Sequence, residues 1–224
     1  MCGYFFHFSK NLKKRDKLEI QNIRRDIERR GNDNFKYLQK KNFSMFFSRL
    51  SIIDLYKRSD QPFTDKGNNY YLIFNGEIYN YLELKKQMIN DGINFYTKSD
   101  TEVLFKLLIN KGIQQTLKVI QGMFSFVFYD VKKKKIYGAR DHFGQKPLYY
   151  YKSCKTVLIS TSLRPIYKNI NENHNIDLNI NSVKQYLCCN GNGLIRKDKT
   201  FFNNILSLQA GSYITIYKGK SSIK

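Results

Sequence analysis

The chain of 224 residues contains no tryptophan, only three prolines and only four cysteines. Four cysteines are too few for a disulfide framework in a chain of this length, so we expect reduced thiols at Cys2, Cys154, Cys188 and Cys189. No apolar run approaches the roughly 20 residues that cross a bilayer. The apolar start is too short for a secretory signal, and lysines follow it rather than precede it. These absences predict a cytoplasmic protein without a membrane partner.

Acidic residues are also scarce. There are 18 of them against 39 Lys and Arg, which gives a formal net charge of +21. Such an excess is found in proteins that bind nucleic acid or anionic membranes. The basic residues here are scattered, and no basic run is interleaved with aromatics in an RNA-binding pattern. We therefore interpret the charge as compositional and expect no specific nucleic-acid partner. A DNA-binding module is the alternative, and it predicts an affinity that falls steeply with salt.

Material for a core is plentiful, because 42% of the residues are hydrophobic and 15% are aromatic. Apolar stretches predict single strands at residues 2–8, 43–55 and 212–217, and another that runs from residue 70 to a turn at Asn75–Gly76. They also predict a hairpin within residues 123–141 and two strands within residues 147–162. Helical spacing predicts helices at 17–30, 81–89 and 181–187. Another helix should begin after Ser99, with Glu102 as capping-box partner and Gly112 as its end. Residues 32–42 should form a loop or an irregular hairpin. The pattern indicates an α+β fold with helices packed on sheet faces.

Position 2 carries an unusual chemical combination. Removal of Met1 would leave Cys2 with a nucleophilic sulfur and a free α-amino group in one residue. The ordinary pKa of an α-amino group is about 7.7–8.0, so a useful fraction is neutral near pH 7 and can accept the thiol proton. The adjacent Gly3 removes side-chain bulk where a substrate would approach. Taken alone, Cys2 could equally be a packing residue, because single cysteines usually are.

Seven further segments follow Met-Cys-Gly in a fixed order. They are RGND (30–33), RLSIIDL (49–55), QP (61–62), FNGEIYNY (74–81), SDTEVL (99–104), GMFSFVFYD (122–130) and ARDHFGQKPLYY (139–150). Together they resemble the class II glutamine amidotransferase domain, and within that class the N-terminal half of glutamine-hydrolysing asparagine synthetase. The resemblance covers nearly the whole chain. It implies the N-terminal-nucleophile hydrolase fold, an αββα sandwich of two antiparallel sheets flanked by helices.

The resemblance also implies a reaction, the hydrolysis of L-glutamine to glutamate and ammonia through a γ-glutamyl thioester. Cys2 would be the nucleophile, with its own amine as the base. The side-chain amide of Asn75 and the backbone N–H of Gly76 would stabilise the oxyanion of the tetrahedral intermediate. No metal ligand and no cofactor are expected in this chain.

The substrate contacts follow from the same resemblance. A planar guanidinium suits the α-carboxylate of glutamine better than an ammonium does, and Arg49 occupies that family position. Asp100 and Glu77 match the positions that hold the α-amino end, and the backbone near Ile53 would line the pocket. Asp100 would also be favourable simply as a carboxylate in the first turn of a helix.

Two other features of the pattern concern structure rather than chemistry. Phe6 stands where the family usually has a small residue, and a bulky ring there needs compensating space. Phe6 therefore keeps open a degenerate domain that binds glutamine or a partner without turnover. In the last segment we interpret Arg140 and Asp141 as a structural pair, and Tyr149 and Tyr150 as core or interface residues.

The expected domain organisation is a core followed by a connection. Residues 2–168 would form the amidotransferase core, and residues 169–224 an extension leading towards an ATP-using synthetase domain. A Ser-Gly-Gly-x-Asp-Ser phosphate loop does not occur here, so ATP and Mg²⁺ are expected only in that missing domain. The expected partners are L-glutamine and a synthetase domain or subunit that receives ammonia, and a homodimer stays open. The complete reaction would convert ATP, aspartate and glutamine to asparagine, glutamate, AMP and diphosphate. Another acceptor in the same family, such as a sugar, is the alternative.

Overall fold

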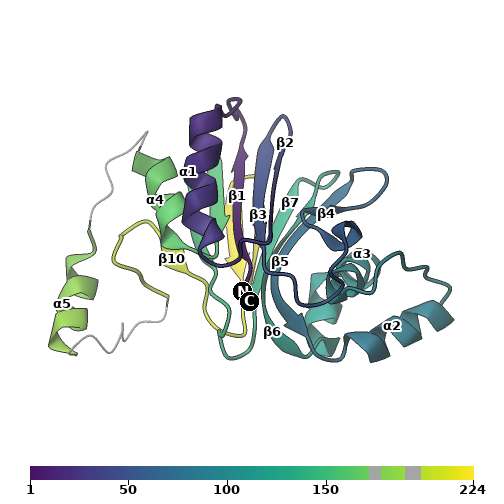
Figure 1. The fold of residues 1–224 in the computed structure, drawn as a ribbon. Coiled ribbons are helices and arrows are strands. Elements are labelled where there is room, and N and C mark those ends of the chain that lie inside the picture. Colours follow the sequence, from purple (N-terminus) through teal and green to yellow (C-terminus); the bar gives the residue numbers. More distant parts are fainter. Residues whose placement is uncertain (172–177, 190–197) are drawn as a thin grey trace.

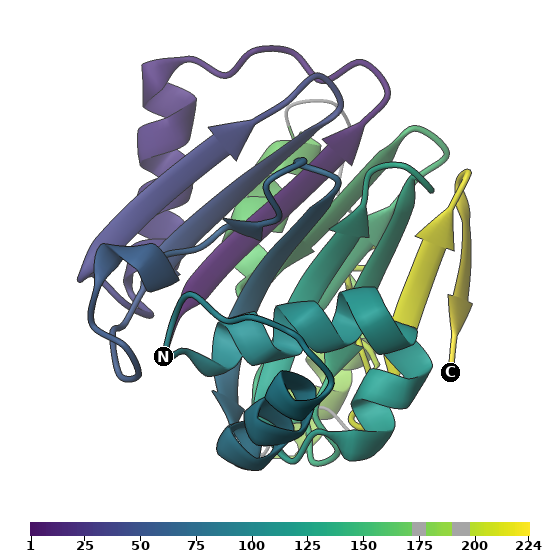
Figure 2. The same ribbon diagram turned by 90° about the vertical axis from the view of Figure 1, so that its right-hand side faces the viewer.

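Two six-stranded antiparallel sheets stack face to face in the computed structural model, and helices cover both outer faces (Figure 1, Figure 2). The structure describes residues 1–171, 178–189 and 198–224. The first sheet has the order β10 (Leu206–Ser207), β8 (Tyr149–Lys152), β9 (Thr156–Ser160), β1 (Gly3–Ser9), β3 (Phe43–Arg49) and β2 (Asn34–Gln39). The second has the order β12 (Lys220–Ile223), β11 (Tyr213–Tyr217), β7 (Lys135–Arg140), β6 (Gly122–Asp130), β5 (Tyr70–Ile78) and β4 (Phe63–Thr64).

The helices divide between the two outer faces. The first sheet is covered by α1 (Lys17–Glu28) and α4 (Leu163–Asn171), and the second by α2 (Tyr81–Asn90) and α3 (Asp100–Val119). A short 3₁₀ turn, η1 (Lys57–Ser59), precedes β4, and α5 (Ile180–Cys188) follows α4 along the chain. The layers are therefore those of the expected αββα sandwich, and the α+β fold class is confirmed.

The alternation of side chains along each strand divides the core into three layers. Tyr4 and Phe6 of β1 face the second sheet, whereas Phe5 between them faces α1 and α4. In the layer between the sheets, the rings of Phe6 and Tyr129 have centroids 6.0 Å apart. β1 lies between β9 and β3 in the first sheet, and its two faces pack against the second sheet and against the helices, so it carries large apolar side chains on both.

Three strand predictions need correction. The strand expected at residues 43–55 ends at Arg49, and the residues after it form an irregular loop. Residues 34–39, expected in a loop or irregular hairpin, form the regular strand β2, which pairs with β3 from Asn34 opposite Arg49 onward. The turn predicted at Asn75–Gly76 is absent, because β5 continues to Ile78 while pairing with β6 at every residue. Ladder pairing overrides the local turn signal here.

The helix after Ser99 differs from its prediction in two ways. The Ser99 hydroxyl oxygen does cap it by accepting the Thr101 N–H at 3.0 Å. The Glu102 carboxylate, however, forms no capping box, since it accepts the backbone N–H groups of Tyr96 and Thr97 instead. Gly112 does break the helical path, with φ 71° and ψ 172°, but helical structure resumes beyond it to the end of α3.

The C-terminal part of the chain joins both sheets. The predicted helix at 181–187 and strand at 212–217 are confirmed as α5 and β11, whereas α4, β10 and β12 had no predicted counterpart. The loop expected between α5 and β11 lies partly outside the described residues. The suggested boundary after residue 168 falls inside α4, and the division into core and extension stays a prediction.

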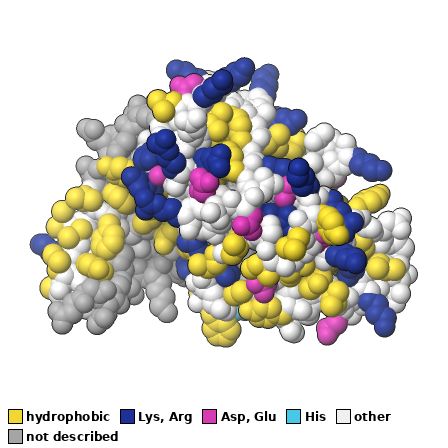
Figure 3. Space-filling model, in the orientation of Figure 1, with side chains coloured by type: hydrophobic (Ala, Val, Ile, Leu, Met, Phe, Trp, Pro, Cys, Tyr) yellow, Lys and Arg dark blue, Asp and Glu magenta, His cyan; other side chains and the backbone are white. Residues whose placement is uncertain are grey.

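Two surface properties accompany this architecture. Figure 3 shows Lys and Arg side chains spread over the viewed face among hydrophobic and acidic ones, rather than gathered in a single stripe. Within the ranges that the structure describes, no helix has the length and apolar character needed to cross a bilayer.

Candidate active site

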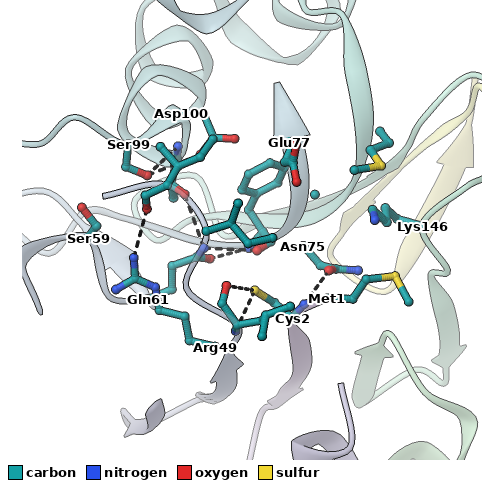
Figure 4. A pocket seen from close by; sticks show the side chains of 17 residues that line it. Met1, Cys2, Arg49, Ser59, Gln61, Asn75, Glu77, Ser99, Asp100 and Lys146 are labelled. Atoms are coloured by element: carbon teal, nitrogen blue, oxygen red, sulfur yellow. Dashed lines mark hydrogen bonds between the residues drawn. The ribbon is translucent and has the colours of Figure 1, made fainter. Parts of the chain in front are cut away.

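A cavity of about 240 Å³ lies where the N-terminal end of β1 meets β5 and the start of α3 (Figure 4). Its lining includes every residue to which the sequence assigned a role with glutamine: Cys2, Arg49, Ile53, Asn75, Gly76, Glu77 and Asp100. These positions are spread over almost one hundred residues of sequence, and the two sheets bring them together.

The sulfur of Cys2 is held against the backbone that follows β3. The Leu50 N–H donates to Sγ at 3.4 Å, and the thiol donates to the Leu50 carbonyl oxygen at 3.6 Å. Burial raises the pKa of the Cys2 thiol, and the hydrogen bond from Leu50 only partly opposes this. The thiol is therefore the favoured form near neutral pH, and a nucleophilic thiolate requires a base close by.

Asn75 connects the two sheets at the cavity. Alternation along β5 directs Tyr71, Ile73 and Asn75 into the space between the sheets. The Asn75 Oδ1 accepts the Cys2 backbone N–H at 2.9 Å. Its Nδ2 is buried and has no hydrogen-bond partner among the described residues. An unsatisfied buried donor costs about 1–3 kcal/mol, so this amide is suited to a ligand oxygen that arrives in the cavity.

The backbone N–H of Gly76 points away from β6. Its partner in the ladder, Phe124, uses its N–H and carbonyl to bond Asp141 on the opposite side. The Gly76–Phe124 pair is therefore of the non-hydrogen-bonded kind, and the polar backbone groups of Gly76 face the free edge of β5.

The neighbouring N–H groups on this edge are already occupied. The Phe74 N–H donates to Gln61 Oε1 at 2.6 Å, and the Ile78 N–H donates to Asp100 Oδ2 at 3.0 Å. Between them, the Gly76 N–H has no hydrogen-bond partner within the described parts of the chain. It therefore provides a second donor beside the Asn75 amide.

Glycine is required at position 76 by the close approach of β6. Gly76 has φ 154°, and a Cβ there would lie 2.0 Å from the carbonyl oxygen of Met123. Any side chain would therefore push β5 away from β6 and move the donor at position 76.

Arg49 anchors the loop after β3 over the cavity. Its Nη1 bonds Asp60 Oδ1 at 2.7 Å, and its Nη2 donates to the carbonyl oxygens of Ile53 and Asp54 at 3.2 and 2.6 Å. The ion pair with Asp60 is almost fully buried. Sequence reasoning missed Asp60, because nothing in its local context marks it as a partner of Arg49.

Asp100 lies in the first turn of α3, directly after Ser99, and its side chain lines the cavity. Burial raises the pKa of Asp100 to about 6, although its hydrogen bond from Ile78 favours the charged form. The nearby carboxylate of half-buried Glu77 raises this pKa further. A cationic group placed beside Asp100 would stabilise its ionised form and lower this pKa.

A model of the family described as "Glutamine amidotransferase domain" matches residues 1–224. The chain belongs to the class II glutamine amidotransferases. Over 219 residues it is 32% identical to "Asparagine synthetase [glutamine-hydrolyzing] 1" of Bacillus subtilis, covering 96% of this chain and 33% of that protein. The asparagine synthetase of Gallus gallus is 34% identical over 155 residues, covering 66% of this chain and 26% of that protein. The amidotransferase thus spans about a third or less of these curated relatives.

Solved structures support the fold at low sequence identity. A glutamine phosphoribosylpyrophosphate amidotransferase from B. subtilis matches with a TM-score of 0.69 at 16% identity, over 100% of this chain and 49% of that chain. A structure described as the allosteric regulatory enzyme of purine biosynthesis matches with a TM-score of 0.66 at 15% identity, over 100% and 48%. The predicted N-terminal-nucleophile αββα sandwich is confirmed.

Phe6 does not obstruct the cavity, because it is not among the residues that line it. It is fully buried between the sheets, opposite Met45 and Ile159 of the neighbouring strands. At about 3.4 Å per residue, the four positions between them place it about 14 Å from Cys2. The compensating space that a bulky ring needs is therefore provided by the core between the sheets.

Arg140 and Asp141 of the amidotransferase are structural, as expected, but they do not bond each other. The Asp141 carboxylate accepts backbone N–H groups from Phe124, Phe143, Gln145 and Lys146. The Arg140 guanidinium donates to the carbonyl oxygens of Gly144, Lys146 and Leu208 and to Ser207 Oγ. Together they order the segment between β7 and β8.

Two further lining residues of the amidotransferase were not singled out by sequence reasoning. Gln61 bonds both backbone groups of Phe74, at 2.6 and 3.1 Å, and so acts in place of a neighbouring strand at the edge of β5. Lys146 lines the cavity from the β7–β8 segment. Gln61 lies in the QP segment and Lys146 in the ARDHFGQKPLYY segment, but the resemblance gave neither residue a role.

The described ranges contain no group of three or more His, Cys, Asp or Glu placed to hold a metal ion.

Proposed function

We propose that this chain, after removal of Met1, hydrolyses L-glutamine to glutamate and ammonia with Cys2 as the nucleophile. The observation that carries the proposal is the buried Asn75 Nδ2, which has no partner in the described part of the chain and lies beside the Cys2 backbone nitrogen. The thiol, the nitrogen that becomes its α-amine, and a free hydrogen-bond donor are all at the same cavity.

The reaction begins with proton transfer from the Cys2 thiol to its own α-amine. The thiolate sulfur then forms a bond to the side-chain carboxamide carbon of glutamine, and the carbonyl π electrons move to oxygen. Asn75 Nδ2 and the Gly76 N–H donate to this oxyanion. Collapse of the intermediate breaks the C–N bond, and the α-ammonium gives its proton to the departing ammonia. Water, activated by the same amine, then hydrolyses the thioester and restores the thiol.

The rest of the substrate would be held by the charged lining. The α-ammonium of glutamine would lie beside Asp100 and Glu77, where it would stabilise the charge of the buried Asp100 carboxylate. Its α-carboxylate is placed at Arg49, with the backbone near Ile53 as the adjacent wall. Because Arg49 also holds the Ile53 and Asp54 carbonyl groups, substrate binding and ordering of this loop would be coupled.

We further propose that the ammonia passes to an ATP-dependent synthetase domain or subunit that amidates aspartate. Support comes from the relatives named as glutamine-hydrolysing asparagine synthetases, of which this chain matches about a third or less. A cytoplasmic location agrees with this assignment, and the homodimer stays a prediction.

Glutamate release by the purified chain, with Met1 removal verified by mass spectrometry, tests the proposal. Cys2→Ala should abolish release, whereas Cys154→Ala, which removes an exposed thiol, should leave it unchanged. Release that persists in Cys2→Ala would contradict the thiol mechanism. If the folded, Met1-free chain binds glutamine by calorimetry but releases no glutamate, the proposal of turnover by this chain alone is wrong.

A further inference from the structure

Lys146 is a buried lysine at the candidate site. Its residue is only 7% exposed, and its side chain lines the cavity together with Cys2 and Asn75 (Figure 4). Its ammonium has no ion pair and no hydrogen bond within the described parts of the chain. Most of the side chain is packed, but the ammonium is not among the fully buried atoms without a partner, so it reaches the open space of the cavity.

The backbone holds Lys146 in this position. Its N–H donates to Asp141 Oδ2 at 2.9 Å, and its carbonyl oxygen accepts from Arg140 Nε at 2.9 Å. The ordered β7–β8 segment, rather than any side-chain partner, therefore directs the ammonium to the cavity. Figure 4 places Lys146 on the Asn75 side of the cavity, with Asp100 on the opposite side.

Besides Lys146, charges of both signs surround the Cys2 nitrogen. The Arg49 charge is paired with Asp60 at 2.7 Å. Glu77 and Asp100 line the opposite part of the cavity and would favour a protonated amine. At the rim, the exposed tip of Arg30 donates to the sulfur of Met1 at 3.6 Å.

We propose that Lys146 is a positioning residue of the site, a fixed cation that keeps the α-amine of mature Cys2 neutral and thereby able to accept the thiol proton. The inference rests on the proposed function. A like charge disfavours the charged form of a neighbouring group, and the effect is larger in a cavity than in water. Asn75 Oδ1 holds the nitrogen in place, at 2.9 Å in the structure, while Lys146 acts on its protonation.

The size of the effect follows from titration. The ordinary pKa of an α-amine is about 7.7–8.0, so only about one-seventh is neutral at pH 7. If the pKa of the α-amine is lowered by about one unit, about three-fifths of the amine is neutral at pH 7. The neutral amine that can accept the thiol proton is then about fourfold more abundant.

The direct test measures the amine without requiring turnover. In the Met1-free full chain carrying Cys2→Ala, which removes the overlapping thiol titration, the N-terminal alanine is followed by NMR across pH. Adding Lys146→Gln should raise the amine midpoint by about one pH unit, and Lys146→Arg should leave it within about 0.3 units. Lys40→Gln, which removes an exposed charge at the β2–β3 turn, is the matched control and should have no effect.

An unchanged midpoint in Lys146→Gln would overturn the inference whether or not the chain hydrolyses glutamine. Conversely, a shifted midpoint without glutamate release would contradict only the proposed function. If Lys146→Gln does not fold, Lys146→Met provides the same comparison.

The pH profile of turnover gives the second readout. With Cys2 intact, Lys146→Gln should move the acid limb of kcat/KM up by about one unit and lower kcat/KM about fourfold at pH 7, with little change at pH 9. A purely structural role would lower the rate equally at every pH and would contradict the inference.

Discussion

Two different cavities lie near the two ends of β1. At the N-terminal end is the cavity of about 240 Å³ that contains Cys2. At the other end, on the outer face of the first sheet, is a wider one of about 820 Å³ whose lining includes His7, Lys13, Arg15 and Lys155. Size and positive charge alone would favour the second cavity as a binding site.

The hydrogen bonding and protonation of the buried polar groups favour the first cavity as the binding site. Asn75 Nδ2 has no partner in the described structure, and burial raises the pKa of Asp100 to about 6. In the larger cavity, Arg15 Nη2 lies 2.6 Å from His7 Nδ1 and donates to Asn169 Oδ1 at 2.7 Å. The comparison teaches that a buried donor beside a nucleophilic side chain, rather than volume or net charge, distinguishes the site suited to chemistry in this protein.

The largest expected effect at the smaller cavity, apart from loss of Cys2, comes from Asn75→Ala. Removal of one oxyanion donor typically lowers kcat about 10²–10³-fold, so we expect that loss in glutamate release. The substitution also removes Oδ1, which accepts the Cys2 backbone N–H at 2.9 Å, so the free energy of unfolding should fall by about 0.5–1.5 kcal/mol. Asn110→Ala, on the exposed side of α3, is the control for steady-state assays. A decrease of less than threefold in Asn75→Ala would remove this amide from the mechanism.

Asp100 and Glu102 offer a sharper comparison, because both are buried carboxylates in the first turn of α3. Asp100 has a pKa of about 6 in the folded state against 3.8 as its ordinary value. The unfolded chain therefore binds fewer protons between about pH 4 and 6, and this group lowers stability as pH rises through that range. At pH 7, Asp100→Asn should stabilise the protein by about 1–3 kcal/mol while weakening glutamine binding about 10–100-fold.

Glu102→Gln should have the opposite effect on stability. The Glu102 carboxylate accepts the N–H groups of Tyr96 and Thr97 and the Thr97 hydroxyl, and it pairs with Lys106. Its loss should destabilise the fold by about 1–3 kcal/mol. Urea unfolding and glutamine calorimetry on both variants measure the contrast. Equal effects of the two substitutions on binding would mean that Asp100 is only a helix-capping carboxylate.

The smallest effect on turnover is expected at the larger cavity. Burial, and then the charge of Arg15, lowers the pKa of His7 to about 3. The unfolded chain therefore binds more protons between about pH 3 and 6.5, so stability is lost as pH falls through that window, by up to about 2 kcal/mol at pH 5. His7→Gln should show less of this loss, with glutamate release unchanged at pH 8. A clear fall in turnover at pH 8 would show that the two cavities are not independent.

Local patterns in the sequence were sufficient for the elements whose partners are close along the chain. The apolar run of β1, the helical spacing in α1 and the β6–β7 hairpin agree with their predictions. The errors lie where distant pairing decided the outcome. The turn signal at Asn75–Gly76 was overridden by nine consecutive pairs between β5 and β6. The polar residues of β2 form a strand because β3 provides a complete ladder.

By itself, the sequence determined which residues are available for chemistry: a cysteine one cleavage away from a free amine, an arginine, an amide and two carboxylates in segments of recognisable order. Only the tertiary structure decided what those groups can do. It aimed the Gly76 N–H away from β6, left Asn75 Nδ2 without a partner among the described residues, paired Arg49 with Asp60 and brought Lys146 to the lining of the cavity. Hydrogen-bond direction, desolvation and charge pairing depend on neighbours from distant segments, so they arise only when the two sheets and α3 meet.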